Sequence, residues 1–342
     1  MKAARIFGKR DLRVVDSTDP EPGRGEVLVA VRAVAICPAD MRLYRDFETG
    51  GVVPEEPIIP GHEFSGVIEE VGERVEGVEP RMRVGVEPSW HCGRCDLCEM
   101  GCHNICRNIV FPSFPPRDGA MAEKIACPAF SVHPVPDEMG WVEAALVEPL
   151  GVAIHAVRLA QLEPGDGVAI LGAGVIGLCV MQVAQAEGIG DIAVAEPREA
   201  RRPLAQRLGA GLVAPRADDL CRDMADPTAQ PRVVFEASGD PRAVREALEL
   251  CRPAGVVVVI GIPEPDEVAF ESAIARRKEL TLIFTRRSRD TLGEAVRLAA
   301  SGKAQLAELP VLTFPLAEAP EAMEAAMDPP GDVLRVVILP SA

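Results

Sequence analysis

The sequence predicts an α/β protein in which a β-rich part is followed by a doubly wound parallel sheet. In residues 1 to about 150, short apolar runs such as 27–31 are separated by Pro and Gly clusters such as 20–23, which is typical of strands joined by turns. From about Gly151 onward, apolar strand-length runs alternate with helix-length segments. The chain has 342 residues, which at ~150 residues per domain is room for about two domains.

The elements can be assigned in chain order. The clearest strands of the first part are 27–31 and 64–68. In the second part, strands are predicted over 168–171, 191–196, 233–236, 255–260 and 280–285, and helices over 175–187, 199–208 and 241–251. From about Thr291 a further helix precedes extended segments that end at 333–339. Because strands and helices alternate, the second part is predicted to form a parallel sheet covered on both faces.

The charge and the hydropathy restrict the function. Lys and Arg number 36 and Asp and Glu 52, so the formal net charge is −16. Nucleic acids and anionic membranes carry charge of the same sign, which argues against either as a partner. No apolar run reaches the ~18 residues of a membrane span, and charged side chains interrupt residues 1–15, where an export signal needs an apolar core. We therefore expect a cytoplasmic protein.

Half of the ten cysteines lie between Cys92 and Cys106. Four of them, Cys92, Cys95, Cys98 and Cys106, follow the spacing Cys-x2-Cys-x2-Cys-x7-Cys. A closed set of four thiolates in a short segment is typical of structural zinc, which stabilises a loop that lacks a core of its own. Four unrelated buried cysteines are the alternative, but such cysteines scatter along a chain. Cys102 falls outside the spacing and is expected to be a spare thiol.

A glycine-rich turn follows the predicted strand 168–171. Residues 172–177 have the pattern Gly-x-Gly-x-x-Gly and open a predicted helix, which is the context in which this motif binds a dinucleotide. The first glycine permits the tight turn, the second lets the backbone approach a pyrophosphate, and the third lets helix and strand pack closely. Amide N–H groups at the start of the helix then face the phosphates. The predicted cofactor contacts in this turn are Gly172, Gly174, Val175, Ile176 and Gly177.

An acidic residue, Glu196, ends the next predicted strand. A carboxylate there can accept hydrogen bonds from the ribose hydroxyls and repels a 2′-phosphate, so it favours NAD over NADP. Several arginines follow it and weaken this preference, since a guanidinium can bind the additional phosphate. A solvated strand end is the alternative interpretation of Glu196. Arg201 is included among the predicted cofactor contacts, as are Ser238 and Gly261 after the later strands.

Further candidate metal ligands lie outside the cysteine cluster, namely Cys37, His62, Glu63 and Glu148. Cys, His and carboxylate are all zinc ligands, and a catalytic zinc uses three protein groups and leaves a position open for water or substrate. Each residue also has a structural interpretation: a core thiol for Cys37, a satisfied buried histidine for His62 and a helix-surface carboxylate for Glu148. Spacing alone leaves the two interpretations open.

As an ordered set, these motifs resemble those of the zinc-containing medium-chain dehydrogenases and reductases, in particular the sorbitol and threonine dehydrogenase branch. The resemblance covers essentially the whole chain. It rests on Gly-His-Glu-Phe-Ser-Gly at 61–66, the four-cysteine lobe, Asp-Gly-Ala-Met-Ala-Glu at 118–123, Glu-Pro-Leu at 148–150, His155-Ala156 and the glycine turn.

The resemblance implies two domains of different fold. A GroES-like catalytic domain would comprise residues 1–152 and 288–342, with the structural zinc lobe at 90–107. A Rossmann domain of residues 153–287, which binds the nicotinamide cofactor, would be inserted between its two parts. The family also implies a homodimer or homotetramer.

The resemblance further implies two zinc ions per chain. Cys37 and His62 would bind a catalytic zinc, with Glu63 and Glu148 completing its ligand shell directly or through water. The four-cysteine lobe would bind the structural zinc. The catalytic zinc would act as a Lewis acid on the substrate oxygen while hydride passes to the nicotinamide ring.

Two departures from the family pattern concern the path of the alcohol proton. Ala39 stands where the family has Ser or Thr, and Arg42 where relatives often have His. Those groups normally relay the proton to solvent, whereas alanine cannot carry one and arginine stays protonated. Either another group acts as the general base, with Glu63, Glu148 and Tyr44 as the candidates, or the reaction differs.

The residues expected to bind a polyol also differ from those of sorbitol dehydrogenases. Leu43 replaces a Tyr, and Thr285-Arg286 replaces an Arg-Tyr pair. The basic residues Arg42, Arg286, Arg287 and Arg289 raise the hypothesis of an anionic substrate, such as a phosphate or a carboxylate. Solvated arginines, or arginines that face the cofactor phosphates, are the alternative.

We therefore predict a zinc-dependent, NAD(P)-linked dehydrogenase that acts on a small polar secondary alcohol or ketone, such as a polyol, a sugar derivative or an amino-alcohol. A reductase of C=C or C=N bonds from the same superfamily is the alternative that Ala39 and Arg42 favour. A non-catalytic NAD(H)-binding protein is the third, which the complete ligand and glycine motifs disfavour. Two zinc ions per chain would support the dehydrogenase, and one would support the reductase.

Overall fold

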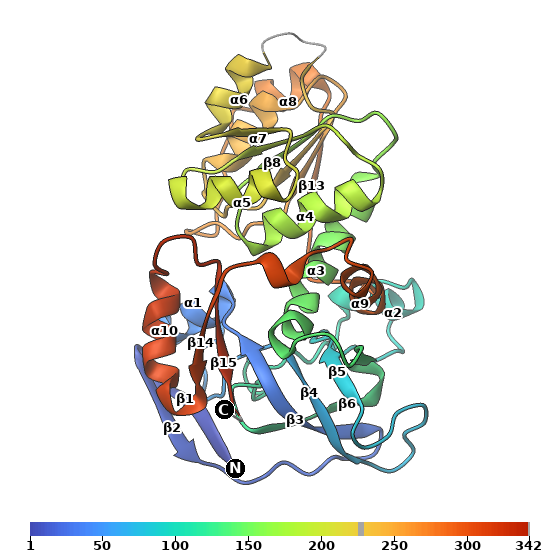
Figure 1. Ribbon diagram of the computed structural model, residues 1–342, viewed down its shortest axis with the longest axis vertical. Helices are drawn as coiled ribbons and strands as arrows, with labels where there is room; N and C mark the ends of the chain where they lie inside the picture. Colours follow the sequence, from blue (N-terminus) through green and yellow to red (C-terminus); the bar gives the residue numbers. More distant parts are fainter. Residues whose placement is uncertain (225–228, 341–342) are drawn as a thin grey trace. The chain divides into compact units, whose positions relative to one another are not determined.

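The computed structural model describes residues 1–224 and 229–340 and divides the chain into two compact units (Figure 1). The first unit comprises Met1–Glu148, Ser288–Ala300 and the chain from Leu306 onward. The second comprises Pro149–Arg287 and Ser301–Gln305. Each unit has its own sheet, one mainly antiparallel and one parallel, so the predicted α/β class is confirmed.

The first unit is built around a seven-stranded sheet in the order β14-β15-β3-β4-β5-β7, with β6 pairing to β3 off this path. Neighbouring strands are antiparallel except β14 and β15, which run parallel. The strands of the sheet are β3 (Glu26–Ala35), β4 (Glu63–Val71), β5 (Arg83–Val86), β6 (Lys124–Pro128), β7 (Val132–Pro134), β14 (Val311–Pro315) and β15 (Arg335–Leu339), and a separate hairpin is formed by β1 (Lys2–Gly8) and β2 (Asp11–Asp16).

The pairing of β3 with β4 positions the site described below. β3 is rich in valine and mostly buried, as expected for a strand covered on both faces. Gly66 of β4 permits close approach, because a Cβ there would lie 2.2 Å from the Ala30 carbonyl oxygen. The register places Ala35 opposite both Glu63 and Val337. The end of β3 therefore meets the beginning of β4 beside β15.

Short helices surround this sheet. Figure 1 shows α10 lying beside β14 and β15, and its buried alanines and Met323 join the core of the first unit. The helices are α1 (Pro38–Asp46), α2 (Asp96–Glu99), α9 (Leu292–Ala300) and α10 (Ala319–Met327), with 3-10 turns η1 (His103–Ile105), η2 (Ala129–Ser131), η4 (Leu306–Glu308) and η5 (Leu316–Glu318). Helix α3 (Trp141–Ala160) begins in the first unit and continues in the second. Among the described residues, no helix is both long and apolar enough to span a membrane.

The second unit contains a six-stranded parallel sheet in the order β10-β9-β8-β11-β12-β13. Its strands are β8 (Val168–Leu171), β9 (Ile192–Ala195), β10 (Leu212–Ala214), β11 (Val233–Glu236), β12 (Val256–Val259) and β13 (Thr281–Phe284). Its helices are α4 (Val175–Ala186), α5 (Arg202–Arg207), α6 (Ala217–Asp223), α7 (Ala243–Leu250) and α8 (Ser272–Lys278), with the 3-10 turn η3 (Glu199–Arg201).

Helices cover both faces of the parallel sheet. Alternate residues of β8, Ala169 and Leu171, pack in a core with α6 and α7. The intervening Ile170 faces the opposite side, where a Cβ on Gly177 of α4 would lie 3.4 Å from its side chain. This arrangement follows from the two-residue period of a strand.

Candidate active site

Three of the four predicted catalytic metal ligands converge at the junction of β3 and β4. The Cys37 sulfur, a His62 ring nitrogen and a Glu63 carboxylate oxygen all lie within 4.8 Å of one another. His62 and Glu63 are 5% and 2% exposed, and Cys37 is partly buried. Their proximity follows from the strand register, because Cys37 comes two residues after the end of β3 and His62 immediately precedes β4.

The backbone around these residues leaves little room for substitution. Gly61 has φ = +96°, and a Cβ there would lie 2.7 Å from a Val34 methyl group and 3.2 Å from the Met121 amide nitrogen. The glycine before His62 is therefore required both by its conformation and by its neighbours.

Asp40 connects the two segments that carry the ligands. Its Oδ2 accepts a hydrogen bond from the Cys37 amide (3.0 Å), and its Oδ1 accepts one from the Gly61 amide (2.9 Å) and lies 3.5 Å from His62 Nδ1. Burial raises the pKa of Asp40, but the nearby His62 and these two amides outweigh burial and hold it below its ordinary value. Nothing in the sequence spacing distinguishes Asp40 from an ordinary acid at the start of a helix.

Glu63 forms a buried ion pair with Arg335 at the start of β15. Glu63 Oε1 accepts a hydrogen bond from Arg335 Nη2 at 2.8 Å, and the side chains are 3% and 8% exposed. The other oxygen, Oε2, is buried without a hydrogen-bond partner among the described residues. A buried carboxylate oxygen that lacks a partner fits a metal ion or a bound water as its missing neighbour.

Glu148, the fourth predicted ligand, lies on α3 and is 6% exposed. It does not belong to the group of donors within 4.8 Å. Burial raises its pKa to about 8 in the protein alone, and the charge of Glu63 contributes to the increase. Glu148 is therefore a buried carboxyl group whose pKa is raised in part by the Glu63 charge, but which lies outside the group of three donors.

Tyr44 is not a suitable general base. Its hydroxyl lies 2.7 Å from Glu324 Oε1, to which it donates, and 3.3 Å from the Arg10 carbonyl oxygen. Burial and the Glu324 hydrogen bond raise its pKa to about 12, so it stays protonated at neutral pH. The prediction that listed Tyr44 as a candidate base is corrected, which leaves Glu63 and Glu148.

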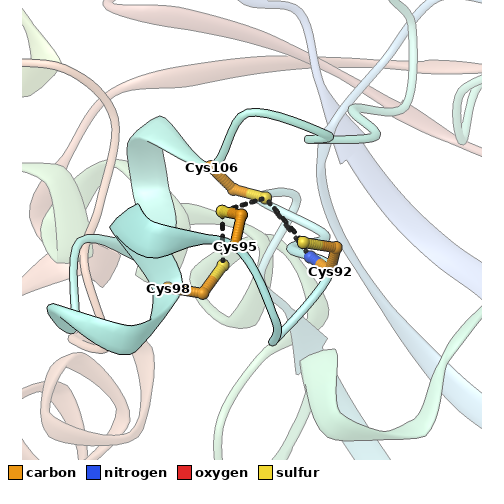
Figure 2. Close-up of side chains that lie close together, drawn as sticks. All are labelled: Cys92, Cys95, Cys98 and Cys106. Atoms are coloured by element: carbon orange, nitrogen blue, oxygen red, sulfur yellow. Dashed lines mark hydrogen bonds between the residues drawn. The ribbon is translucent and has the colours of Figure 1, made fainter.

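The four predicted structural ligands form a separate group in the lobe around α2, which Figure 2 shows. The sulfur–sulfur distances are 3.5 Å for Cys95 and Cys98, 3.8 Å for Cys95 and Cys106, and 3.5 Å for Cys92 and Cys106. A tetrahedron with Zn–S bonds of ~2.3 Å has edges of ~3.8 Å, so the four sulfurs are spaced as zinc requires. A hydrogen bond from the Arg94 amide is the main reason that the pKa of Cys92 falls to about 6, which favours the thiolate that zinc binds.

The fifth cysteine of the cluster, Cys102, stands apart. Its sulfur is not among the four that lie within 4.8 Å of one another, and it is 3.7 Å from Arg289 Nη1. Arg289, one of the arginines of the anionic-substrate hypothesis, therefore contacts the cysteine lobe. All ten cysteines are free thiols in the structure.

The predicted cofactor residues gather at the carboxyl ends of adjacent strands in the second unit. Gly172 follows β8, Glu196 follows β9, Ser238 follows β11 and Gly261 follows β12, and these four strands are neighbours in the sheet. This edge is where open parallel sheets bind their ligands. Val175 and Ile176 form the first turn of α4, and Arg201 ends η3.

The glycine turn has the close contacts that its motif predicts. Gly172 has φ = +102°, and a Cβ on Gly177 would lie 1.9 Å from the Gly172 carbonyl oxygen. Gly174 caps α4 with open space around its Cα. Glu196, which is 3% exposed, accepts hydrogen bonds from the Ala173 amide (2.7 Å) and the Arg198 amide (2.8 Å), so its carboxylate is fixed beside the turn.

Comparison with known proteins agrees with this arrangement. The model of the alcohol dehydrogenase GroES-like domain matches residues 23–137, and that of the zinc-binding dehydrogenase domain matches residues 175–301. Sorbitol dehydrogenase of Bacillus subtilis (strain 168) is 32% identical over 100% of this chain and 98% of its own length.

Solved structures extend the likeness to three dimensions. A zinc-binding dehydrogenase of Sinorhizobium meliloti 1021, bound to NADP, is 30% identical with a TM-score of 0.89 over 99% of both chains. An alcohol dehydrogenase of Escherichia coli CFT073, complexed with NADH, is 26% identical with a TM-score of 0.91 over 99% of both chains. This chain therefore belongs to the zinc-containing medium-chain alcohol dehydrogenase family and is an oxidoreductase that transfers hydride between a nicotinamide cofactor and a small polar alcohol or ketone.

Proposed function

We propose that the enzyme interconverts a polyol and the corresponding ketose, that Cys37, His62 and Glu63 hold its catalytic zinc, and that Glu148 completes the ligand shell directly or through water. The observation that carries this proposal is the buried convergence of three unlike donors at the end of β3, with Glu63 Oε2 unpartnered among the described residues. Mixed sulfur, nitrogen and oxygen donors with an incomplete shell are typical of catalytic zinc. The polyol assignment draws on the sorbitol dehydrogenase relative.

These residues would hold a zinc ion, which would serve as a Lewis acid toward the substrate oxygen. The protein's own contribution is to hold the donors in place. Arg335 binds one oxygen of Glu63, and Asp40 binds the amides of Cys37 and Gly61. Ala39 offers no hydroxyl, so Glu63 and Glu148 are the groups that remain to carry the alcohol proton away.

In this proposal the four-cysteine lobe holds a second, structural zinc. The two units serve as the catalytic domain and the cofactor domain of the family. The first unit corresponds to the catalytic domain (1–152 and 288–342), and the second to the cofactor domain (153–287). NAD is the preferred cofactor, since the fixed Glu196 carboxylate would repel a 2′-phosphate. One structural relative binds NADH and another binds NADP, so the cofactor preference of this enzyme has to be measured.

A spectrophotometric screen tests the proposed function. We expect NAD to be reduced in the presence of sorbitol or a related polyol, with NADP about 10-fold less effective, a difference of ~1.4 kcal/mol, because the Glu196 carboxylate would repel the 2′-phosphate. Elemental analysis should give two zinc ions per chain. Turnover of no polyol, together with a single zinc ion per chain, would contradict the proposal and favour a reductase of C=C or C=N bonds.

We also propose that the protein assembles as a homodimer or homotetramer. β13 forms one edge of the parallel sheet, and its Phe284 is 58% exposed. An exposed edge strand with an apolar side chain favours pairing with a second copy. We expect Phe284→Glu to shift the protein toward the monomer in analytical ultracentrifugation, while Phe130→Glu, also at an exposed phenylalanine (52%), should leave the assembly unchanged. A wild-type monomer at micromolar concentration would refute this proposal.

A further inference from the structure

A buried serine in the loop after the cysteine lobe contacts the proposed ligand His62. Ser113 Oγ lies 3.0 Å from His62 Nδ1, and Ser113 is 7% exposed. The ring of Phe111, two residues earlier in the same loop, lies 5.0 Å from the His62 ring between centroids. The loop therefore meets the imidazole with an aromatic ring and with a hydroxyl group.

The backbone at Ser113 is unusual for a serine. The Phe114 amide donates a hydrogen bond to the Phe111 carbonyl (3.1 Å), which closes a turn with Pro112 second and Ser113 third. Ser113 has φ = +68°. Proline in the second position and a positive φ in the third are typical of a type II turn, in which the third residue is normally Gly or Asn. A side chain there strains the backbone, and such strain concentrates at functional sites.

The contact falls on the ring nitrogen that determines the orientation of a histidine ligand. Asp40 Oδ1 also lies near His62 Nδ1, at 3.5 Å, so the Ser113 hydroxyl oxygen is the nearer of the two oxygens to this nitrogen. An Nδ1–H donated to an acceptor leaves the lone pair on Nε2 for a metal and fixes the ring. Removing such a hydrogen-bond partner of a ligating histidine typically lowers metal affinity ~10–100-fold.

We propose that Ser113 is a positioning residue, whose hydroxyl orients His62 for metal binding. The strained turn provides the hydroxyl at the point where the imidazole needs an acceptor. This inference rests on the proposed role of His62 as a zinc ligand. The sequence does not reveal this role, since a single serine in a loop rich in Pro and Phe carries no motif for a metal site.

Two substitutions test the role, Ser113→Ala and Ser113→Gly. Both remove the hydroxyl, but the glycine variant also relieves the strained φ. A loss of zinc affinity caused by backbone strain would therefore appear in Ser113→Ala and not in Ser113→Gly. We expect both to weaken zinc binding at the Cys37–His62–Glu63 site by ~10–100-fold in competition with a chelator. Cobalt substituted for zinc should show altered d–d absorption in both variants.

The control is Ser131→Ala, which removes another buried serine hydroxyl, one that donates to the Pro128 carbonyl (2.6 Å). It should leave zinc affinity and the cobalt spectrum unchanged. Wild-type zinc affinity in both Ser113 variants would overturn the positioning role, while two zinc ions in the wild-type protein would still support the proposed function. A wild-type protein that binds only the zinc of the cysteine lobe would instead contradict the proposed function itself.

Discussion

The substitution His62→Ala is expected to lower kcat/KM for a polyol substrate by at least about 10³-fold, because Lewis-acid stabilisation by zinc is worth several kcal/mol and each ~1.4 kcal/mol is a factor of ten. His62 is the one histidine in the group of donors within 4.8 Å of one another, and its ring is buried. Zinc content should fall from two ions per chain to one, as measured by elemental analysis. Cys37→Ala should have the same two effects, since both side chains are proposed to bind one ion.

His133→Ala is the matched control for this experiment. His133 lies on β7, in the same unit, and is not part of either group of metal-binding side chains. Its removal should leave the zinc content unchanged and kcat/KM within about 3-fold of the wild-type value, an effect below the ~1.4 kcal/mol of a tenfold change. If His62→Ala retained two zinc ions or wild-type activity, His62 would not be a ligand of the catalytic zinc.

Arg335→Met is expected to destabilise the first unit by about 3–5 kcal/mol, because it leaves the buried Glu63 carboxylate without its partner. The ion pair is 2.8 Å long and both side chains are at most 8% exposed, so bulk solvent screens the charges little. The double variant Arg335→Met with Glu63→Gln should recover part of this loss, since a neutral amide carries no uncompensated charge. Urea unfolding monitored by tryptophan fluorescence would report on this unit, because both tryptophans, Trp90 and Trp141, belong to it.

An exposed ion pair provides the comparison. Arg13 and Asp11 form a 2.6 Å pair whose side chains are 61% and 38% exposed. Arg13→Met should cost under ~1 kcal/mol, as exposed pairs do. Equal effects of the two substitutions would show that burial of the Glu63–Arg335 pair does not determine its importance.

Much of the fold could be predicted because its signals are local. The strand 168–171, the glycine turn and the start of α4 follow each other in sequence, and the structure places them as predicted. The four-cysteine lobe is equally predictable, since its cysteines lie within fifteen residues of one another. In both cases the residues that define the feature are close in the chain, so spacing alone carries the information.

The rest of the site depends on contacts that spacing does not encode. Arg335 reaches Glu63 across 272 residues, and Ser113 reaches His62 across 51. Tyr44 is a candidate base in the sequence, yet its hydroxyl donates to Glu324, 280 residues away. Which side chains meet is decided by the pairing of β3, β4 and β15 and by the packing of α10, which only the folded chain reveals.

The position of β15 has a consequence for synthesis on the ribosome. On one edge of β3, β6 pairs with residues 26–30, whereas Val34 and Ala35 pair with β15, so this end of the edge stays open until β15 has been translated. At ~5–20 residues per second, that interval lasts roughly 15–60 s. During it, a nascent chain presents the short unpaired end of β3 and a Glu63 carboxylate that still lacks Arg335. The second unit contains all of its own strands between residues 168 and 284 and can fold earlier. We therefore expect a metal ion to bind at Cys37, His62 and Glu63 late in synthesis, after β15 has left the ribosome.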